Sequence, residues 1–108
     1  MCILHAGNNL SLSRCVMFST TVCPWCDRAA EAIAQRGASC KKINFDNLGP
    51  DGNALAMVVM QQTRQNTVPN IIIDKTHIGG YGELMEVMKR CESRDERIPA
   101  DLCQFFNA

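Results

Sequence analysis

The chain has 108 residues, the length of one domain, and 46% of them are hydrophobic, as in ordinary globular proteins. Its 11 Lys and Arg residues balance 11 Asp and Glu residues, so neither a basic stripe for nucleic acid nor an acidic tail is present. No stretch approaches the roughly 20 apolar residues of a membrane span. From the charge balance we expect no nucleic-acid partner, and from the lack of an apolar span we expect no membrane partner.

The N-terminal stretch MCILHAGNNLS combines a brief apolar run with turn residues at positions 7–9. We therefore expect a flexible extension over residues 1–11 and one folded domain over residues 12–108. The stretch has no basic start, and the first arginine is Arg14, so it is a poor secretory signal and a poor transit peptide.

The first predicted elements form a strand–helix–strand unit. RCVMFS, residues 14–19, is short and apolar and predicts a buried strand. A helix is expected over residues 25–35, because Pro24 suits a first helical turn and Gly37 is placed to end the helix. CKKINF, residues 40–45, predicts a second strand, which a helical connection makes parallel to the first.

A second helix is expected from Asp51, a suitable cap, to about Arg64. Its predicted core-facing residues are Leu55, Val58, Val59 and Gln62. NTVPNIIID, residues 66–74, predicts a third strand, and a tight turn at residues 75–76 leads to a short fourth strand at residues 77–78.

Two helical segments complete the pattern. ELMEVMKR, residues 83–90, is one of them, and the apolar face formed by Ile98, Leu102, Phe105 and Phe106 is the other. The order is therefore β-α-β-α-β-β-α-α, an α/β fold with a four-stranded mixed sheet flanked by helices.

The chain contains seven cysteines, an odd number that does not favour a secreted disulfide scaffold. Five of them are scattered, and we expect these to be small buried hydrophobic residues in a reducing compartment: Cys2, Cys15, Cys40, Cys91 and Cys103. The expected location is the cytoplasm, with the mitochondrial matrix as an alternative.

The remaining two cysteines form the motif CPWC at the predicted start of the first helix. Cys23 would lie at the helix mouth, where free N–H groups and the helix dipole stabilise a thiolate, and Cys26 one turn inside. This is the layout of a dithiol redox site. A zinc site and a permanent disulfide are the less favoured alternatives, because zinc needs four ligands and a reducing compartment opposes the disulfide.

Three motifs together resemble a dithiol glutaredoxin over about residues 12–92: FSTTVCPWC, QNTVPNIII and IGGYGEL. The resemblance implies a thioredoxin fold, with Cys23 as the nucleophile that accepts glutathione and Cys26 as the resolving thiol. It also implies a glutathione-binding set, in which Pro69 has a cis peptide bond: Thr20, Trp25, Gln65, Thr67, Val68, Pro69, Gly80, Tyr81, Gly82 and Glu83.

The sequence departs from the family pattern at three places. Thr20 stands where a lysine is usual, so part of the stabilisation of the thiolate and of glutathione must come from elsewhere. Gly82-Glu83 replaces Ser-Asp or Asp-Asp at the expected site for the γ-glutamyl carboxylate, a helix start. Lys75 replaces a common glycine in the hairpin, which suggests a different turn.

The implied activity is glutathione-dependent thiol–disulfide exchange that reduces glutathionylated proteins and protein or low-molecular-weight disulfides. Glutathione or a related thiol would be the cosubstrate, no metal would be required, and the chain would act as a monomer. The alternative is a glutaredoxin in which Cys23 and bound glutathione hold a bridging [2Fe–2S] cluster between two monomers. Pro24 counts against this alternative, because cluster binding is associated more with Ser or Gly at that position.

Overall fold

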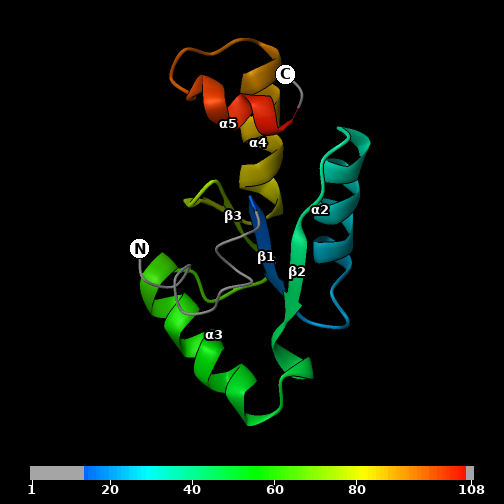
Figure 1. Cartoon of the computed structure of the whole chain (residues 1–108), viewed down its shortest axis with the longest axis vertical. Helices are drawn as coiled ribbons and strands as arrows, with labels where there is room; N and C mark the ends of the chain where they lie inside the picture. The colour runs from blue at the N-terminus through cyan, green and yellow to red at the C-terminus, as the bar shows by residue number, and fades with distance from the viewer. Residues whose placement is uncertain (1–13, 107–108) are drawn as a thin grey trace.

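The central feature is a four-stranded sheet, seen in a computed structural model that describes residues 14–106 (Figure 1). Its strands are β1 (Cys15–Ser19), β2 (Lys41–Asn44), β3 (Asn70–Ile73) and β4 (Thr76–Gly79). They lie in the order β2-β1-β3-β4. β1 is parallel to β2 and antiparallel to β3, and β3 is antiparallel to β4. The mixed sheet expected from the sequence is confirmed, and the expected extension over residues 1–11 lies outside the described residues.

Helices cover both faces of the sheet (Figure 1). One face carries α2 (Pro24–Gln35), α4 (Tyr81–Glu92) and α5 (Ala100–Phe105), and the other carries α3 (Pro50–Thr63) after the short 3₁₀ helix η2 (Phe45–Asn47). Side chains alternate along β1, so that Met17 packs with the first group of helices and Phe18 with α3. All five residues of β1 are buried, which makes this strand the centre of the core.

The helix boundaries follow from proline and glycine positions. α2 begins with Pro24 in its first turn, and the chain leaves the helix at Gly37, whose φ of 77° suits glycine. α3 begins at Pro50 after Gly49, so Asp51 lies within the first turn and is not the cap that the sequence suggested. Among the described residues, no helix is both long enough and apolar enough to cross a membrane.

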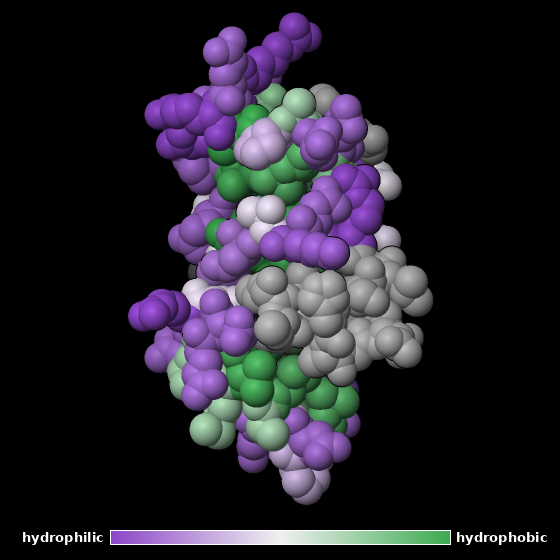
Figure 2. Space-filling model, turned by 60° about the vertical axis from the view of Figure 1, so that its left-hand side comes forward, coloured by the Kyte–Doolittle hydropathy of each residue, from purple (hydrophilic) through white to green (hydrophobic). Residues whose placement is uncertain are grey.

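The predicted core face of α3 is partly wrong. Val59 is buried, but Val58 is 41% exposed and Gln62 is also exposed. Figure 2 shows hydrophobic side chains gathered over the end of the molecule where α3 lies. The reason is that α3 contributes only Val59 to the buried cluster on its face of the sheet, with Leu55 packed against that cluster.

The hairpin between β3 and β4 turns at Asp74 and Lys75, one residue before the predicted turn. Both residues have positive φ, 50° and 65°, as in the two-residue turns that match the twist of a hairpin. Arg14 holds this turn: its Nε and Nη2 donate to the two carboxylate oxygens of Asp74 at 2.9 and 2.7 Å. This ion pair connects the hairpin turn, which lacks glycine, to the residue before β1.

The expectation of unpaired cysteines outside the CPWC motif is wrong for four residues, because disulfides join Cys15 to Cys40 and Cys91 to Cys103. Val16 pairs with Lys41 across the parallel strands, so the residues that precede them are neighbours. In the second case α5 folds back onto α4. Both disulfides depend on tertiary structure, so the spacing of the cysteines in the sequence does not predict the pairing. The argument for a reducing compartment loses this support, and the cytoplasmic location stays a prediction.

Candidate dithiol redox site

Cys23 and Cys26 form a disulfide at the start of α2. Cys23 is the N-cap residue with an extended backbone, and its Sγ accepts a hydrogen bond from the Cys26 N–H at 3.1 Å. Cys23 is 7% exposed, whereas Cys26 is fully buried. Cys23 is therefore the more accessible residue of the pair.

The loop that delivers Cys23 to the helix is held by Asp46. The Thr21 N–H and hydroxyl donate to the Asp46 carboxylate at 3.0 and 2.6 Å. The hydroxyl hydrogen bond is the main reason that the pKa of Asp46 is lowered from its ordinary value of 3.8. Thr20 donates to the Val22 carbonyl oxygen at 3.4 Å, so the position of the usual lysine carries a neutral, locally bonded side chain.

An aromatic rim lies beside the dithiol pair. The ring centroids of Trp25 and Tyr81 are 5.3 Å apart, which brings α2 and α4 together at this point. The Arg28 guanidinium lies 4.7 Å from the Trp25 ring centroid. Trp25 remains 53% exposed, and so it offers an aromatic surface to a ligand next to Cys23.

The peptide bond between Val68 and Pro69 is cis, as the resemblance implied. Gln65 braces this loop, because its Nε2 donates to the carbonyl oxygens of Thr67 and Pro69 at 3.0 and 2.9 Å. The resemblance implied that the Gln65 side chain contacts glutathione. In the structure both amide hydrogens serve the loop, which gives Gln65 a positioning role that the sequence did not indicate.

His77, an exposed residue of β4, connects Gln65 to the buried Asn70. Its Nε2 lies 3.1 Å from Gln65 Oε1 and 3.0 Å from Asn70 Oδ1. The Gln65 amide nitrogen donates to the loop, and that of Asn70 donates to Thr63 Oγ1 at 2.9 Å, so both facing oxygens are acceptors. His77 Nε2 must therefore carry the hydrogen, a tautomer assigned from the network. Burial lowers the pKa of His77. Sequence analysis missed this role, because the contacts depend on the hairpin register.

The third motif, IGGYGEL, leads into the start of α4. Gly80 is the N-cap, and its N–H donates to Glu83 Oε1 at 2.7 Å. Gly79 has a φ of 121°, and a Cβ there would lie 2.9 Å from the Glu83 side chain, so only glycine fits. Free N–H groups at a helix start attract anions, but here the Glu83 carboxylate already lies at that end.

The first two motifs share a pocket, and the second and third motifs pack against the core cluster that contains Cys23. A pocket of about 310 Å³ is lined in part by Thr20, Gln65, Thr67 and Val68. Val68 and Tyr81 pack against the same core cluster that contains Cys23 and Cys26. The arrangement thus joins the more accessible cysteine of the pair, the cis-proline loop and a helix start. Within residues 14–106, no group of three or more His, Cys, Asp or Glu side chains could hold a metal ion.

Comparison with known proteins gives one consistent result. The glutaredoxin family model matches residues 15–78. Glutaredoxin-C1 of Arabidopsis thaliana is 37% identical over 69% of this chain and 59% of its own length, less than two thirds of that relative. Glutaredoxin of Vernicia fordii is 38% identical over 74% of this chain and 76% of its own length. The buckwheat glutaredoxin–glutathione complex, 31% identical, has a TM-score of 0.74 and covers 100% of this chain and 92% of its own.

Proposed function

The chain belongs to the glutaredoxin family, and from this premise we propose that it is a glutathione-dependent thiol–disulfide oxidoreductase acting through Cys23 and Cys26. The observation that carries the proposal is the unequal burial of two sulfurs at the start of α2: Cys23 is partly accessible and Cys26 is enclosed. On this basis we propose that Cys23 attacks the substrate and that Cys26 resolves the mixed disulfide.

With a glutathionylated protein, the Cys23 thiolate attacks the glutathione sulfur, and the protein sulfur leaves as a thiolate that then takes a proton. The thiolate of a second glutathione then attacks the glutathione sulfur of the mixed disulfide, which releases oxidised glutathione and restores the Cys23 thiolate. With a protein disulfide, Cys23 attacks one sulfur of the substrate and the Cys26 thiolate then attacks Cys23. The second protein thiol leaves, and the Cys23–Cys26 disulfide described above remains.

The surroundings of Cys23 support glutathione as the cosubstrate. Thr67 is exposed and Val68 is half-buried, and residues in such a loop can pair their peptide groups with a peptide-like ligand in the manner of a short added strand. The start of α4 suits a carboxylate. The buckwheat relative, a structure of similar fold, was solved in complex with glutathione. We extend the proposal to glutathionylated and disulfide-containing proteins as substrates and to a monomer as the working form.

The proposal is tested with two single substitutions. We expect Cys23→Ser to abolish both deglutathionylation and reduction of protein disulfides, because the cysteine that remains at the start of α2, Cys26, is fully buried. Cys26→Ser should retain deglutathionylation and lose protein-disulfide reduction, since a second glutathione can replace the resolving thiol only in the first reaction. Loss of deglutathionylation in Cys26→Ser, with the variant shown to be folded by circular dichroism, would contradict this division of roles.

A further inference from the structure

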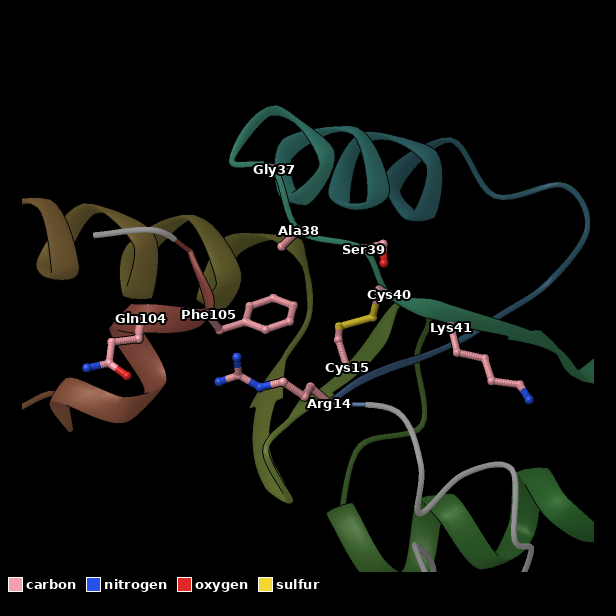
Figure 3. Close-up of a pocket in the computed structure, with 9 residues that line it drawn as sticks. All are labelled: Arg14, Cys15, Gly37, Ala38, Ser39, Cys40, Lys41, Gln104 and Phe105. Atoms are coloured by element: carbon pink, nitrogen blue, oxygen red, sulfur yellow. A yellow bond between two sulfur atoms is a disulfide. The ribbon is translucent and has the colours of Figure 1, made fainter.

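The Cys15–Cys40 disulfide lies at the end of β1 remote from the dithiol pair. Cys15 is the first residue of β1, and Cys23 follows its last residue through a short loop. Five residues of strand span about 17 Å, so the two disulfides are separate sites. A pocket of about 560 Å³ surrounds the Cys15–Cys40 disulfide, and Figure 3 shows the side chains that line it.

The two residues joined by this disulfide differ in accessibility. Cys15 is 1% exposed, whereas Cys40, just before the edge strand β2, is only partly buried. A nucleophile that enters the pocket therefore meets Cys40 Sγ more readily than Cys15 Sγ. Cys15 is then the leaving group, held within the core cluster.

The charges around this disulfide favour an anion. Figure 3 shows the Arg14 guanidinium on one side of the disulfide, near the Phe105 ring, and the Lys41 side chain extending on the other. No acidic residue lines the pocket. Asp74 pairs with Arg14, and Asp101 acts on it electrostatically, whereas the Lys41 ammonium has no ion-pair partner in the part of the chain that is described.

The Cys91–Cys103 disulfide provides an internal comparison. This disulfide also lines a pocket, of about 610 Å³. It also joins a buried cysteine, Cys91, to a partly buried cysteine, Cys103. Two acidic residues, Asp95 and Glu96, line that pocket with Arg94, and Asp95 pairs with Arg90 and Arg97 outside the lining. Pocket size and burial are therefore similar at the two disulfides, and the sign of the lining charge differs.

We propose that Cys15–Cys40 is a second exchange site, one that takes an anionic low-molecular-weight thiol of the glutathione class. Glutathione carries carboxylates at both ends and its thiol in the middle, so one carboxylate can pair with the Lys41 ammonium while the thiol reaches the disulfide. The incoming thiolate bonds to Cys40 Sγ, the Cys15–Cys40 bond breaks, and the Cys15 thiolate takes a proton from water. The product is a mixed disulfide on Cys40, and attack by the Cys15 thiolate reverses the step. The inference goes beyond the proposed function, because neither Cys23 nor Cys26 takes part.

The experiment uses the full chain with Cys2→Ser, Cys23→Ser and Cys26→Ser, so that neither the CPWC pair nor Cys2 can exchange. The oxidised protein is treated in parallel with glutathione and with cysteamine, a cationic thiol. The reactions are stopped by alkylation, and peptide mass spectrometry reports the opening rate of each disulfide and the site of the mixed disulfide. The ratio of the two rates within one molecule cancels the intrinsic reactivity of each thiol.

With glutathione, we expect Cys15–Cys40 to open faster than Cys91–Cys103 and to yield the mixed disulfide on Cys40. The preference should be smaller with cysteamine, and Lys41→Gln should lower the glutathione rate at Cys15–Cys40 about two- to fivefold. Lys75→Gln, an exposed lysine of the hairpin, serves as the control and should change nothing.

Equal rate ratios for the two thiols, no reaction at Cys15–Cys40, or a mixed disulfide on Cys15 would each overturn the proposal. None of these outcomes depends on the activity of Cys23, so a failure here is distinguishable from a failure of the proposed oxidoreductase function.

Discussion

Replacing Glu83 with Gln should improve binding of glutathione. The Glu83 carboxylate accepts from the Gly80 N–H at 2.7 Å and so lies at the start of α4, where the γ-glutamyl carboxylate of the ligand is expected. Two anions then compete for one helix N-terminus. Glutamine keeps an oxygen that can accept from Gly80 and removes the charge, so the helix cap survives while the repulsion is lost.

The size of the effect follows from the energy of a charge at a helix end, about 0.3–1 kcal/mol at an exposed site. Removing the competing charge of Glu83 should therefore lower the KM for glutathione about two- to fivefold. The kcat should stay unchanged, because the charge acts on binding and not on the reacting sulfurs. Steady-state kinetics at low and high ionic strength measures this, and the gain should shrink in high salt.

Glu86→Gln is the matched control for Glu83→Gln, since Glu86 lies on the same helix but pairs with Arg90 away from the helix start. Its KM should equal that of the wild type. An unchanged or raised KM in Glu83→Gln, with the same helix content, would refute the idea that Glu83 competes with the ligand carboxylate. An improvement that persists undiminished in high salt would refute its electrostatic origin.

Two further predictions concern the supports of the site. His77→Ala should lower the free energy of unfolding by about 1–3 kcal/mol in urea denaturation, because the buried Asn70 Oδ1 loses its donor. Thr76→Ala, at an exposed position of the same strand, is the control and should have little effect. An equal loss in both variants would contradict the proposed hydrogen-bond network. Asp46 has a lowered pKa in the fold, so its contribution to stability is present above the unfolded value of 3.8 and lost as the pH falls through the folded pKa. The difference in free energy of unfolding between wild type and Asp46→Asn should be constant near neutral pH and should shrink below about pH 4. A difference that does not change with pH would show that the charge of Asp46 does not contribute to stability.

Sequence reasoning succeeded where local chemistry decides the structure. As expected, α2 begins at Pro24 and the chain leaves the helix at Gly37. The apolar run that ends in Ile73 forms β3 beside β1. The position of Cys23 at a helix mouth also followed from its neighbours in the chain. Each of these features depends on residues within one turn of helix or one strand, so a short window of sequence contains the information.

The missed features depend on contacts between distant segments. The pairing of Cys15 with Cys40 requires the register of two parallel strands, and the contacts of His77 require the hairpin and the end of α3 to be in place. The exposed Val58 shows the same limit, because helical periodicity gives the spacing of a face but not how much of it the sheet covers. Thr20 was identified as a departure, but its bond to the Val22 carbonyl oxygen could not be inferred.

The contact of Arg14 with Phe105 has a consequence for protein engineering. The guanidinium carbon lies 5.3 Å from the ring centroid, so the two ends of the described domain are neighbours. Domains with adjacent ends tolerate circular permutation and insertion into a loop of a host protein. Because Cys23 lies beyond the opposite end of β1, a host joined at residues 14 and 106 would lie at the end of the domain away from the dithiol pair. The domain is therefore suited to carrying a thiol-exchange centre into another protein while holding the entry and exit points of the host chain together.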